Sequence, residues 1–186
     1  MMTTKVQLLT ETAIMSALAI VFNYLVLFQM PQGGSVSLTF VPIILLSLKY
    51  GLLTGSISGL ITGVISLVFG GYFLNPIQVL FDYILAFALI GLAGIFSAQF
   101  KKALKQKQSK KAGFTVIMGG LVGGIFSLIS HFLAGIFFYQ SFAPEGQPVW
   151  LYSLVYNSSY VIPDTILAII IVLILINRIP SFFIKS

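Results

Sequence analysis

The stretch VLFDYILAF, residues 79–87, places one carboxylate, Asp82, within an otherwise apolar run. An acidic side chain at the centre of a membrane helix adds roughly 2.5 to 3.5 kcal/mol to the cost of insertion, so a chain that keeps one usually uses it or pairs it. Tyr83 follows directly and adds a phenol hydroxyl. These two residues are the first candidates for a binding site.

The only histidine of the chain, His131, lies in a second apolar run. Ser127, His131, Gly135 and Tyr139 follow one another at four-residue spacing, which stacks them on one stripe of a helix. At about 1.5 Å per residue, Asp82 lies roughly 9 Å below the start of its helix, and His131 lies roughly 12 Å below Tyr139. These comparable depths predict a shared pocket.

A third group opens the last apolar run, in PVWLYSLVYNSSY, residues 148–160. Aromatic residues such as Trp150 and Tyr152 at this level often form a belt at the membrane interface. Asn157 fits a belt poorly, because an amide about two turns inside the helix needs hydrogen-bond partners. Together with the first two groups, this segment predicts a site for a small, flat, polar ring system.

The charge of the predicted pocket indicates the charge of its ligand. Its expected charged group is the Asp82 carboxylate, and aromatic faces attract cations. A cationic aromatic ligand therefore fits better than an anionic one. Asp164 lies seven residues after Asn157, about 10 Å deeper on nearly the same face, and the sequence leaves three roles open for it: paired, protonated or part of a gating path.

Enzymatic chemistry is not indicated. With one histidine and no cysteine, the chain offers neither a multi-histidine metal site nor a cysteine nucleophile, and no Gly is followed by Lys as a phosphate-binding loop requires. We expect no metal, no cofactor and no ATPase activity, so uphill transport would take its energy from ions or partner subunits.

Composition identifies an integral membrane protein, because 58% of the 186 residues are hydrophobic and only 8% are charged, against roughly 25% in soluble domains. Six apolar runs predict an all-α bundle of six transmembrane helices in one compact domain, residues 1–186. The run at 37–49 is short and contains Pro42, which predicts a kinked, tilted or partly spanning helix. The expected spans are 8–28, 37–49, 52–70, 76–99, 114–139 and 150–176.

The net charge of +6 does not indicate nucleic-acid binding, because no aromatic residue interleaves the lysines of the 101–111 connector. If successive connectors lie on alternating sides of the membrane, all ten basic residues fall on the same side. Under the positive-inside rule, this predicts that both termini are cytoplasmic. This basic side would adjoin anionic lipid of the bilayer. The basic residues are Lys5, Lys49, Lys101, Lys102, Lys105, Lys107, Lys110, Lys111, Arg178 and Lys185.

The outer loops, 29–36, 70–76 and 140–149, are rich in Gly and Pro. Gly33 and Gly34 in the first of them predict either a lid or a plain connector. Small residues also recur at four-residue spacing within the helices, as in Ala13 and Ala17 and in the glycines at 51, 55, 59 and 63. Such stripes predict either packing inside the bundle or a docking face for another membrane subunit.

Several segments resemble one known family. These are VQLLTETAIMSALAIVF, MPQGGSVS, VLFDYILAF, HFLAGIFFYQSFAPEGQPVWLYSLVYNSSYVIP and the lysine-rich inner loop. They are similar to the thiamine-specific substrate-binding subunit, or S-component, of energy-coupling-factor (ECF) vitamin importers of prokaryotes. The resemblance implies a six-helix, multi-pass subunit of the cell membrane that binds thiamine from outside and works with a transmembrane coupling subunit and two cytoplasmic ATPases.

The resemblance also implies roles for individual residues. The loop between the first two helices would close the entrance, and Ala13 and Ala17 would face the coupling subunit. Some relatives carry Glu at the position of Asp82, Trp at Tyr139 and a lysine contact at Ser127. The pocket residues implied by the match are Asp82, Tyr83, His131, Gly135, Tyr139, Tyr152 and Asn157.

Thiamine fits the residues as well as the resemblance, because it joins a cationic thiazolium to an aminopyrimidine. Asp82 would balance the charge or accept from the amino group, Asn157 would hydrogen-bond, and Tyr139, Tyr152 and Trp150 would stack. Two alternatives stay open: an S-component for another vitamin, and a self-sufficient proton-coupled carrier with Asp82, His131 and Asp164 as its relay.

Overall fold

The computed structural model of the protein describes residues 5–184, so the predicted inner-side residue Lys185 lies outside the described part. Its helices are α1 (Lys5–Tyr24), α2 (Phe40–Tyr50), α3 (Leu52–Val68), α4 (Pro76–Val79), η1 (Leu80–Leu85), α5 (Ala86–Ala88), η2 (Leu89–Phe96), α6 (Ser97–Lys105), α7 (Ser109–Phe138), η3 (Gln140–Phe142), α8 (Val149–Arg178) and α9 (Ser181–Ile184). A short antiparallel ladder joins β1 (Phe28–Gln29) to β2 (Ser35–Val36).

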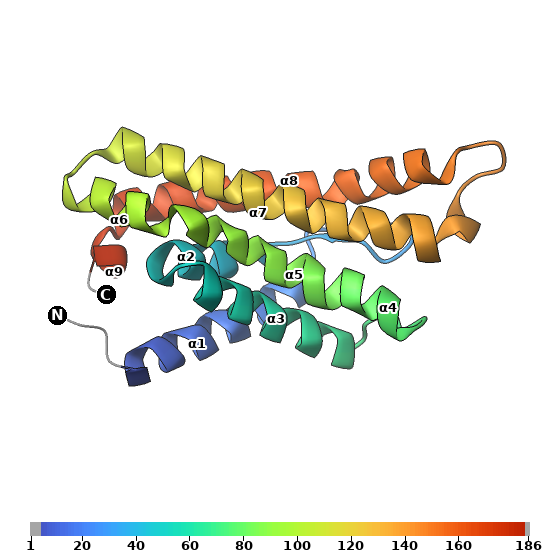
Figure 1. Ribbon diagram of the computed structural model, residues 1–186, viewed down its shortest axis with the longest axis horizontal. Coiled ribbons are helices and arrows are strands. Elements are labelled where there is room, and N and C mark those ends of the chain that lie inside the picture. The colour runs from blue at the N-terminus through green and yellow to red at the C-terminus, as the bar shows by residue number, and fades with distance from the viewer. Residues whose placement is uncertain (1–4, 185–186) are drawn as a thin grey trace.

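The helices run along one long axis (Figure 1). Segments α4 to α6 form one continuous helical run, Pro76–Lys105. Four described helices are long and apolar enough to cross a membrane: Lys5–Tyr24, Pro76–Lys105, Ser109–Phe138 and Val149–Arg178. The predicted runs at 37–49 and 52–70 are helices too, but shorter, as Phe40–Tyr50 and Leu52–Val68. The all-α class is confirmed, with four long apolar helices and two short ones.

Helix α2 lies in the middle of the bundle and is buried from Phe40 through Lys49. Its 11 residues extend about 16 Å, roughly half of a 30 Å hydrocarbon layer. Pro42 sits in the first turn, where its missing N–H has no partner to lose. The chain reaches this short helix through the non-helical segment 25–39, which contains the β1–β2 hairpin. Such non-helical backbone is tolerated at membrane depth where it lines a cavity.

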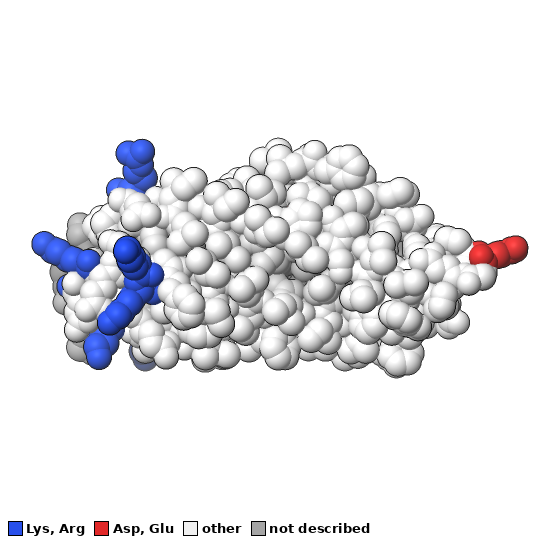
Figure 2. All heavy atoms as spheres, turned by 90° about the horizontal axis from the view of Figure 1, so that it is seen from above, with Lys and Arg blue, Asp and Glu red and all other residues white. Residues whose placement is uncertain are grey.

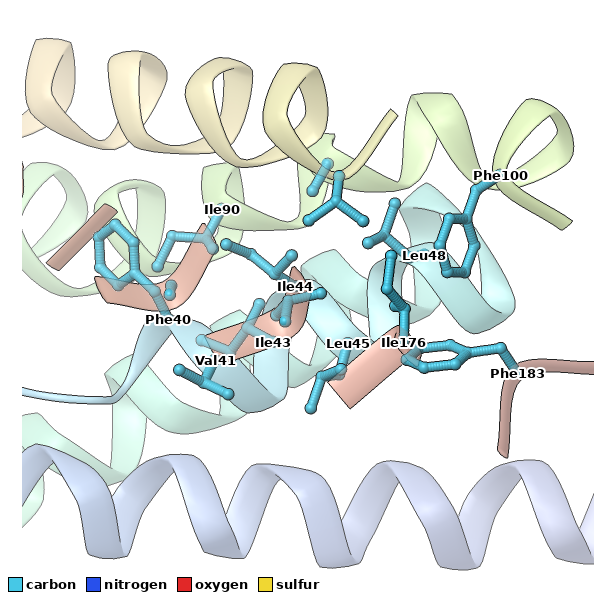
Figure 3. Packing of buried hydrophobic residues seen from close by; sticks show 14 of the residues in the cluster. Phe40, Val41, Ile43, Ile44, Leu45, Leu48, Ile90, Phe100, Ile176 and Phe183 are labelled. Carbon is cyan, nitrogen blue, oxygen red and sulfur yellow. The ribbon is translucent and has the colours of Figure 1, made fainter. Parts of the chain in front are cut away.

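The apolar core surrounds α2 and contains side chains from α2, η2, α6, α8 and α9 (Figure 3). Phe100 and Phe183 are fully buried and pack edge to face, with ring centroids 5.1 Å apart. Helix α9 thus closes the core at the same end of the bundle as α6 (Figure 1).

Glycines allow α3 and α7 to approach their neighbours closely. A side chain at Gly59 or Gly63 would strike the backbone of Phe87 or Tyr83, and one at Gly124 would strike Thr165. These glycines of α3 and α7 therefore serve close packing of the helices inside the bundle. Ala13 and Ala17 differ, because both are exposed on α1.

Basic side chains collect at one end of the molecule and an acidic one lies at the opposite end, with an uncharged face between them (Figure 2). We call the first the lysine-rich end, after residues 101–111, and the second the loop end, where 29–36, 70–76 and 140–149 lie. Lys49 is an exception among the basic residues, because it is 2% exposed and pairs with Glu11 at 2.6 Å. Its ammonium also lies 3.9 Å from the ring centroid of Phe182 in α9.

Candidate ligand-binding site

A cavity of about 670 Å³ opens in the half of the bundle nearer the loop end. This volume is within the usual range for small-molecule sites, about 300 to 1,000 Å³. Its walls come from α1, the 31–39 segment, α3, η1, α7 and α8. Among the described residues that line it, Asp82 and Asp164 are the acidic ones and no Lys or Arg is present. The cavity therefore favours a neutral or cationic ligand.

Asp82 is held by three side chains. Its Oδ2 accepts from Gln78 Nε2 at 2.8 Å and from Tyr139 OH at 2.9 Å. His131 Nδ1 lies 3.2 Å from Oδ1. Carboxylate oxygens accept about four hydrogen bonds in total, so Asp82 keeps capacity for a ligand donor. Asp82 therefore contacts two residues of the stripe with which a shared pocket was predicted, His131 and Tyr139.

The start of this helix follows from its local sequence. Asn75 Oδ1 caps the first turn by accepting from Ile77 N at 2.9 Å and from Gln78 N at 3.0 Å, and Pro76 follows as the first helical residue. The next turn, η1, is a π turn in which Ala86 N–H bonds to Phe81 O, five residues back. Asp82 and Tyr83 lie within it.

Asn157 has the partners that its amide requires. Its Nδ2 donates to Ser153 O at 2.8 Å and to His131 O at 3.3 Å, and its Oδ1 accepts from Tyr160 OH at 2.6 Å. This network joins α8 to α7 behind His131. The His131 ring in turn packs edge to face on Tyr160, with centroids 5.6 Å apart. The amide is therefore fixed in orientation beside the cavity.

Tyrosine rings form much of the cavity wall. Tyr152 and Tyr156 stack with centroids 5.8 Å apart and an interplanar angle of 23°. Tyr72 and Tyr139 also line the cavity, with ring centroids 6.2 Å apart, and the Tyr72 backbone N–H donates to Tyr83 OH at 2.6 Å. A flat cationic ring between such faces gains both dispersion and cation–π attraction.

The first loop descends along α8 and forms one side of the cavity. Gly34 N donates to Tyr156 OH at 3.0 Å, and further down Ser37 N donates to Asp164 Oδ1 at 2.7 Å. Gly33 has a φ of +96°, a conformation that favours glycine. The tight turn at Gly33 and the two anchors on α8 fix the loop beside the site.

Comparisons with known proteins match this arrangement over nearly the whole chain. The family model described as "Thiamine transporter protein (Thia_YuaJ)" matches residues 9–184. The chain belongs to this thiamine transporter family. Thiamine transporter ThiT of Bacillus subtilis (strain 168) is 39% identical over 175 residues, covering 92% of this chain and 91% of the relative.

Two further relatives agree. Thiamine transporter ThiT of Lacticaseibacillus paracasei is 32% identical over 180 residues, which is 95% of this chain and 90% of the relative. The solved structure of ThiT from Listeria monocytogenes has a TM-score of 0.90 and 30% identity, covering 96% of this chain and 98% of that one. The fold is thus that of the thiamine transporter family.

Most residues predicted for the site of this family member lie together around the cavity. Gly33 and Gly34 of the predicted lid line it as well. At Gly135 a side chain would strike Ser153, so the glycine leaves room for α8 to approach. The predicted binding residues that line the cavity are Asp82, Tyr83, His131, Gly135, Tyr139, Tyr152 and Asn157.

Two predicted binding residues are not among the cavity lining. Ser127 is buried between helices, and its hydroxyl has no hydrogen-bond partner among the described residues. One turn separates it from His131, and the helix packs closely there, so the predicted stripe reaches the cavity only from His131 onward. Trp150 is 54% exposed at the start of α8, consistent with the interface belt that was the alternative for this segment.

Other cavity residues of this thiamine transporter were missed. Asn23 and Ser66 bond to each other across α1 and α3 at 3.1 Å, and Thr39 OH donates to Asn23 Oδ1 at 3.5 Å. Tyr72 lies in a loop. Small hydroxyl residues in apolar helices are common and gave no signal, whereas Asn23, an amide near the end of an apolar run, offered the same clue as Asn157.

Proposed function

We propose that the protein is the thiamine-binding S-component of an ECF-type vitamin importer, and that it captures thiamine in the cavity near its loop end. It is a transport subunit and not an enzyme. The observation that supports the assignment best is the Asp82 cluster, in which a carboxylate bonded to His131 and Tyr139 faces a tyrosine-lined cavity without a cationic side chain among its described residues.

The ligand contacts follow from the chemistry of the lining. The Asp82 carboxylate supplies a counter-charge for the thiazolium or an acceptor for the aminopyrimidine NH₂. Tyr139 and Tyr152 offer ring faces, and His131 and Asn157 offer polar edges. We do not retain Ser127 and Trp150 as contacts, because neither lines the cavity.

The membrane arrangement is the second part of the proposal. Residues 1–186 form one domain of six apolar helices in the cell membrane of a bacterium, with the lysine-rich end in the cytoplasm and the loop end outside. The start of α1 and helix α9, the first and last described helical segments, lie near the lysine-rich end (Figure 1), which supports a cytoplasmic location for this end under the positive-inside rule. Under this arrangement the cavity opens outward, and the loop carrying Gly33 and Gly34 is its lid.

Partner subunits are the third part. We propose that a transmembrane coupling subunit and two cytoplasmic ATPases complete the importer. The exposed Ala13 and Ala17 on α1 provide a smooth face on which a partner helix can pack closely. Ala13→Trp should leave thiamine binding intact and abolish copurification with the coupling subunit, whereas intact copurification would defeat this docking face.

Calorimetry on the purified protein tests the ligand. Thiamine should bind, and riboflavin and biotin should not. Thiamine diphosphate should bind more weakly than thiamine, because its negative charges would enter a cavity that contains two carboxylates and no described cationic side chain. Equal affinities for thiamine and its diphosphate would contradict this account of the pocket.

The self-sufficient proton-coupled carrier is the competing function. Asp82 and His131 are in contact, but the hydrogen bond of Asp164 is to the backbone of Ser37 and does not extend the pair into a relay. Vesicles that contain this chain alone should bind thiamine without accumulating it. Accumulation driven by a pH gradient alone would establish the carrier instead.

A further inference from the structure

The π turn η1, Leu80–Leu85, is the part of the backbone on which the Asp82 cluster depends. Asp82 and Phe87 both line the cavity, although they are five residues apart. In a regular α-helix, residues five apart point about 140° away from each other. The extra residue of a π turn makes side chains five residues apart point in similar directions. Such turns are frequent at functional sites.

Two neighbouring helices hold this turn from opposite sides. On the α3 side, Gly63 lies so close to the Tyr83 carbonyl that any side chain there would strike it. On the α7 side, Ser130 Oγ donates to Phe81 O at 2.6 Å. Phe81 O is the same carbonyl that accepts the π hydrogen bond from Ala86 N–H. Ser130 is only 2% exposed and directly precedes His131 in the sequence.

We propose that Ser130 is a positioning residue for ligand binding: its hydroxyl fixes the π turn and thereby holds Asp82 toward the cavity. Ser130 does not line the cavity, so it acts through the backbone of Phe81 and the carboxylate one residue later. This inference rests on the proposed function, because its effect is read as thiamine affinity. A ligand-free measurement of the turn itself keeps the two separable.

The chain provides a matched control for the test. Ser127 lies on the same helix, three residues earlier, and is buried to the same degree, but its hydroxyl has no partner among the described residues. Ser130→Ala should raise the thiamine Kd about three- to tenfold, because binding would then have to restore the turn geometry that one buried hydrogen bond holds in the wild type. Ser127→Ala should change the Kd by less than about twofold, and Ser130→Thr, which keeps the hydroxyl, should restore most of the affinity.

A double-mutant cycle separates positioning from general stability. In an Asp82→Asn protein, adding Ser130→Ala should cost less than about twofold in affinity, because the carboxylate that the turn positions is already gone. The same threefold or greater loss in that background would assign Ser130 to the fold alone and overturn the proposal. Equal losses for Ser127→Ala and Ser130→Ala would overturn it as well.

Hydrogen exchange on the ligand-free protein completes the experiment. Ser130→Ala should speed exchange of the amides in residues 80–86, and Ser127→Ala should not. Unchanged exchange in Ser130→Ala would overturn the proposal even if thiamine binding fell. If the wild-type chain failed to bind thiamine, the proposed function would fall, while the exchange data would still decide whether Ser130 holds the turn.

Discussion

The two halves of this bundle differ in what they enclose: one contains a polar cavity and the other an apolar core. Near the loop end, the backbone departs from regular helix at the 25–39 segment and the π turn, and polar side chains surround a cavity. Near the lysine-rich end, α2, α6 and α9 close an apolar core with Phe100 and Phe183 at its centre. Irregular backbone occurs in both halves, because η2 is a 3₁₀ segment whose Ile90 and Ala93 pack into the apolar core, but only near the loop end does such backbone line a cavity.

Each half also contains a charged contact of its own. Asp82 is bonded by Gln78, His131 and Tyr139 and remains open to the cavity, whereas Lys49 is paired with Glu11 away from it. The first charge is arranged for a ligand and the second for cohesion between α1 and α2. If this division is right, substitutions in one half should change binding and those in the other should change stability.

The largest effect is expected at Asp82. Asp82→Asn should weaken thiamine binding by about 1.5 to 3 kcal/mol, roughly ten- to 150-fold, because hydrogen bonds to a charged group are lost. The melting temperature of the ligand-free protein should change little, since an amide of the same shape replaces the carboxylate. Calorimetry and thermal unfolding in detergent measure the two quantities, and wild-type affinity in this variant would remove the counter-charge from the account.

The next effect belongs to the opposite half. Glu11→Ala leaves the buried ammonium of Lys49 without its partner and should lower the free energy of unfolding by about 2 kcal/mol, less than for a fully buried pair because Glu11 is partly exposed. The thiamine Kd, measured under conditions where the variant is fully folded, should stay within about twofold of the wild-type value. Denaturant titration in detergent gives the stability. A tenfold loss of affinity with unchanged stability would contradict the separation of the halves.

A smaller effect is expected at Asp164, the inner anchor of the proposed lid loop. Asp164→Ala leaves the Ser37 N–H without its acceptor and should weaken thiamine binding by about 1 to 2 kcal/mol. The loss should appear mainly as faster dissociation, because the loop that we propose as the lid would be less firmly held. Asp164→Asn, whose amide oxygen can still accept from Ser37, should restore most of the difference in a stopped-flow measurement. Equal dissociation rates in wild type and Asp164→Ala would exclude an anchoring role.

The smallest effect is at Phe182. Phe182→Leu removes the ring beside the Lys49 ammonium and should lower the free energy of unfolding by about 1 kcal/mol, between the values for exposed and desolvated cation–π contacts, because the ammonium is buried and Phe182 is partly exposed. Binding should not change. Denaturant titration measures this difference, and a loss as large as that of Glu11→Ala would mean that the ring, rather than the carboxylate, stabilises the ammonium.

The sequence predicted the elements well, because long apolar runs between Gly, Pro and charged connectors leave little ambiguity. It also placed Asp82, His131 and Asn157 near one another, since buried polar groups in a membrane helix need an interior position. The short length of α2 was foreseen from Pro42 and the brevity of its run. What was missed depends on contacts between distant segments.

Three cases illustrate what the sequence does not reveal. The Lys49–Glu11 pair joins α1 to α2, yet Lys49 was assigned only to the charge pattern of one side. The π turn around Asp82 is stabilised by a bond from α7, which a pattern within residues 79–87 does not reveal. Ser127 was placed in the site from its four-residue spacing, but close packing buries it outside the cavity. Periodicity gives the face of one helix, whereas the neighbours decide which part of that face meets open space.

Trp150 is the only tryptophan of the chain and is exposed beyond the cavity, at the start of α8. The intrinsic indole emission of this protein therefore reports on the outer rim and its surrounding detergent or lipid. Ligand binding among the tyrosines would therefore change the emission of Trp150 very little. An indole introduced at Tyr139 would give the pocket its own optical probe while the native indole supplied a constant background.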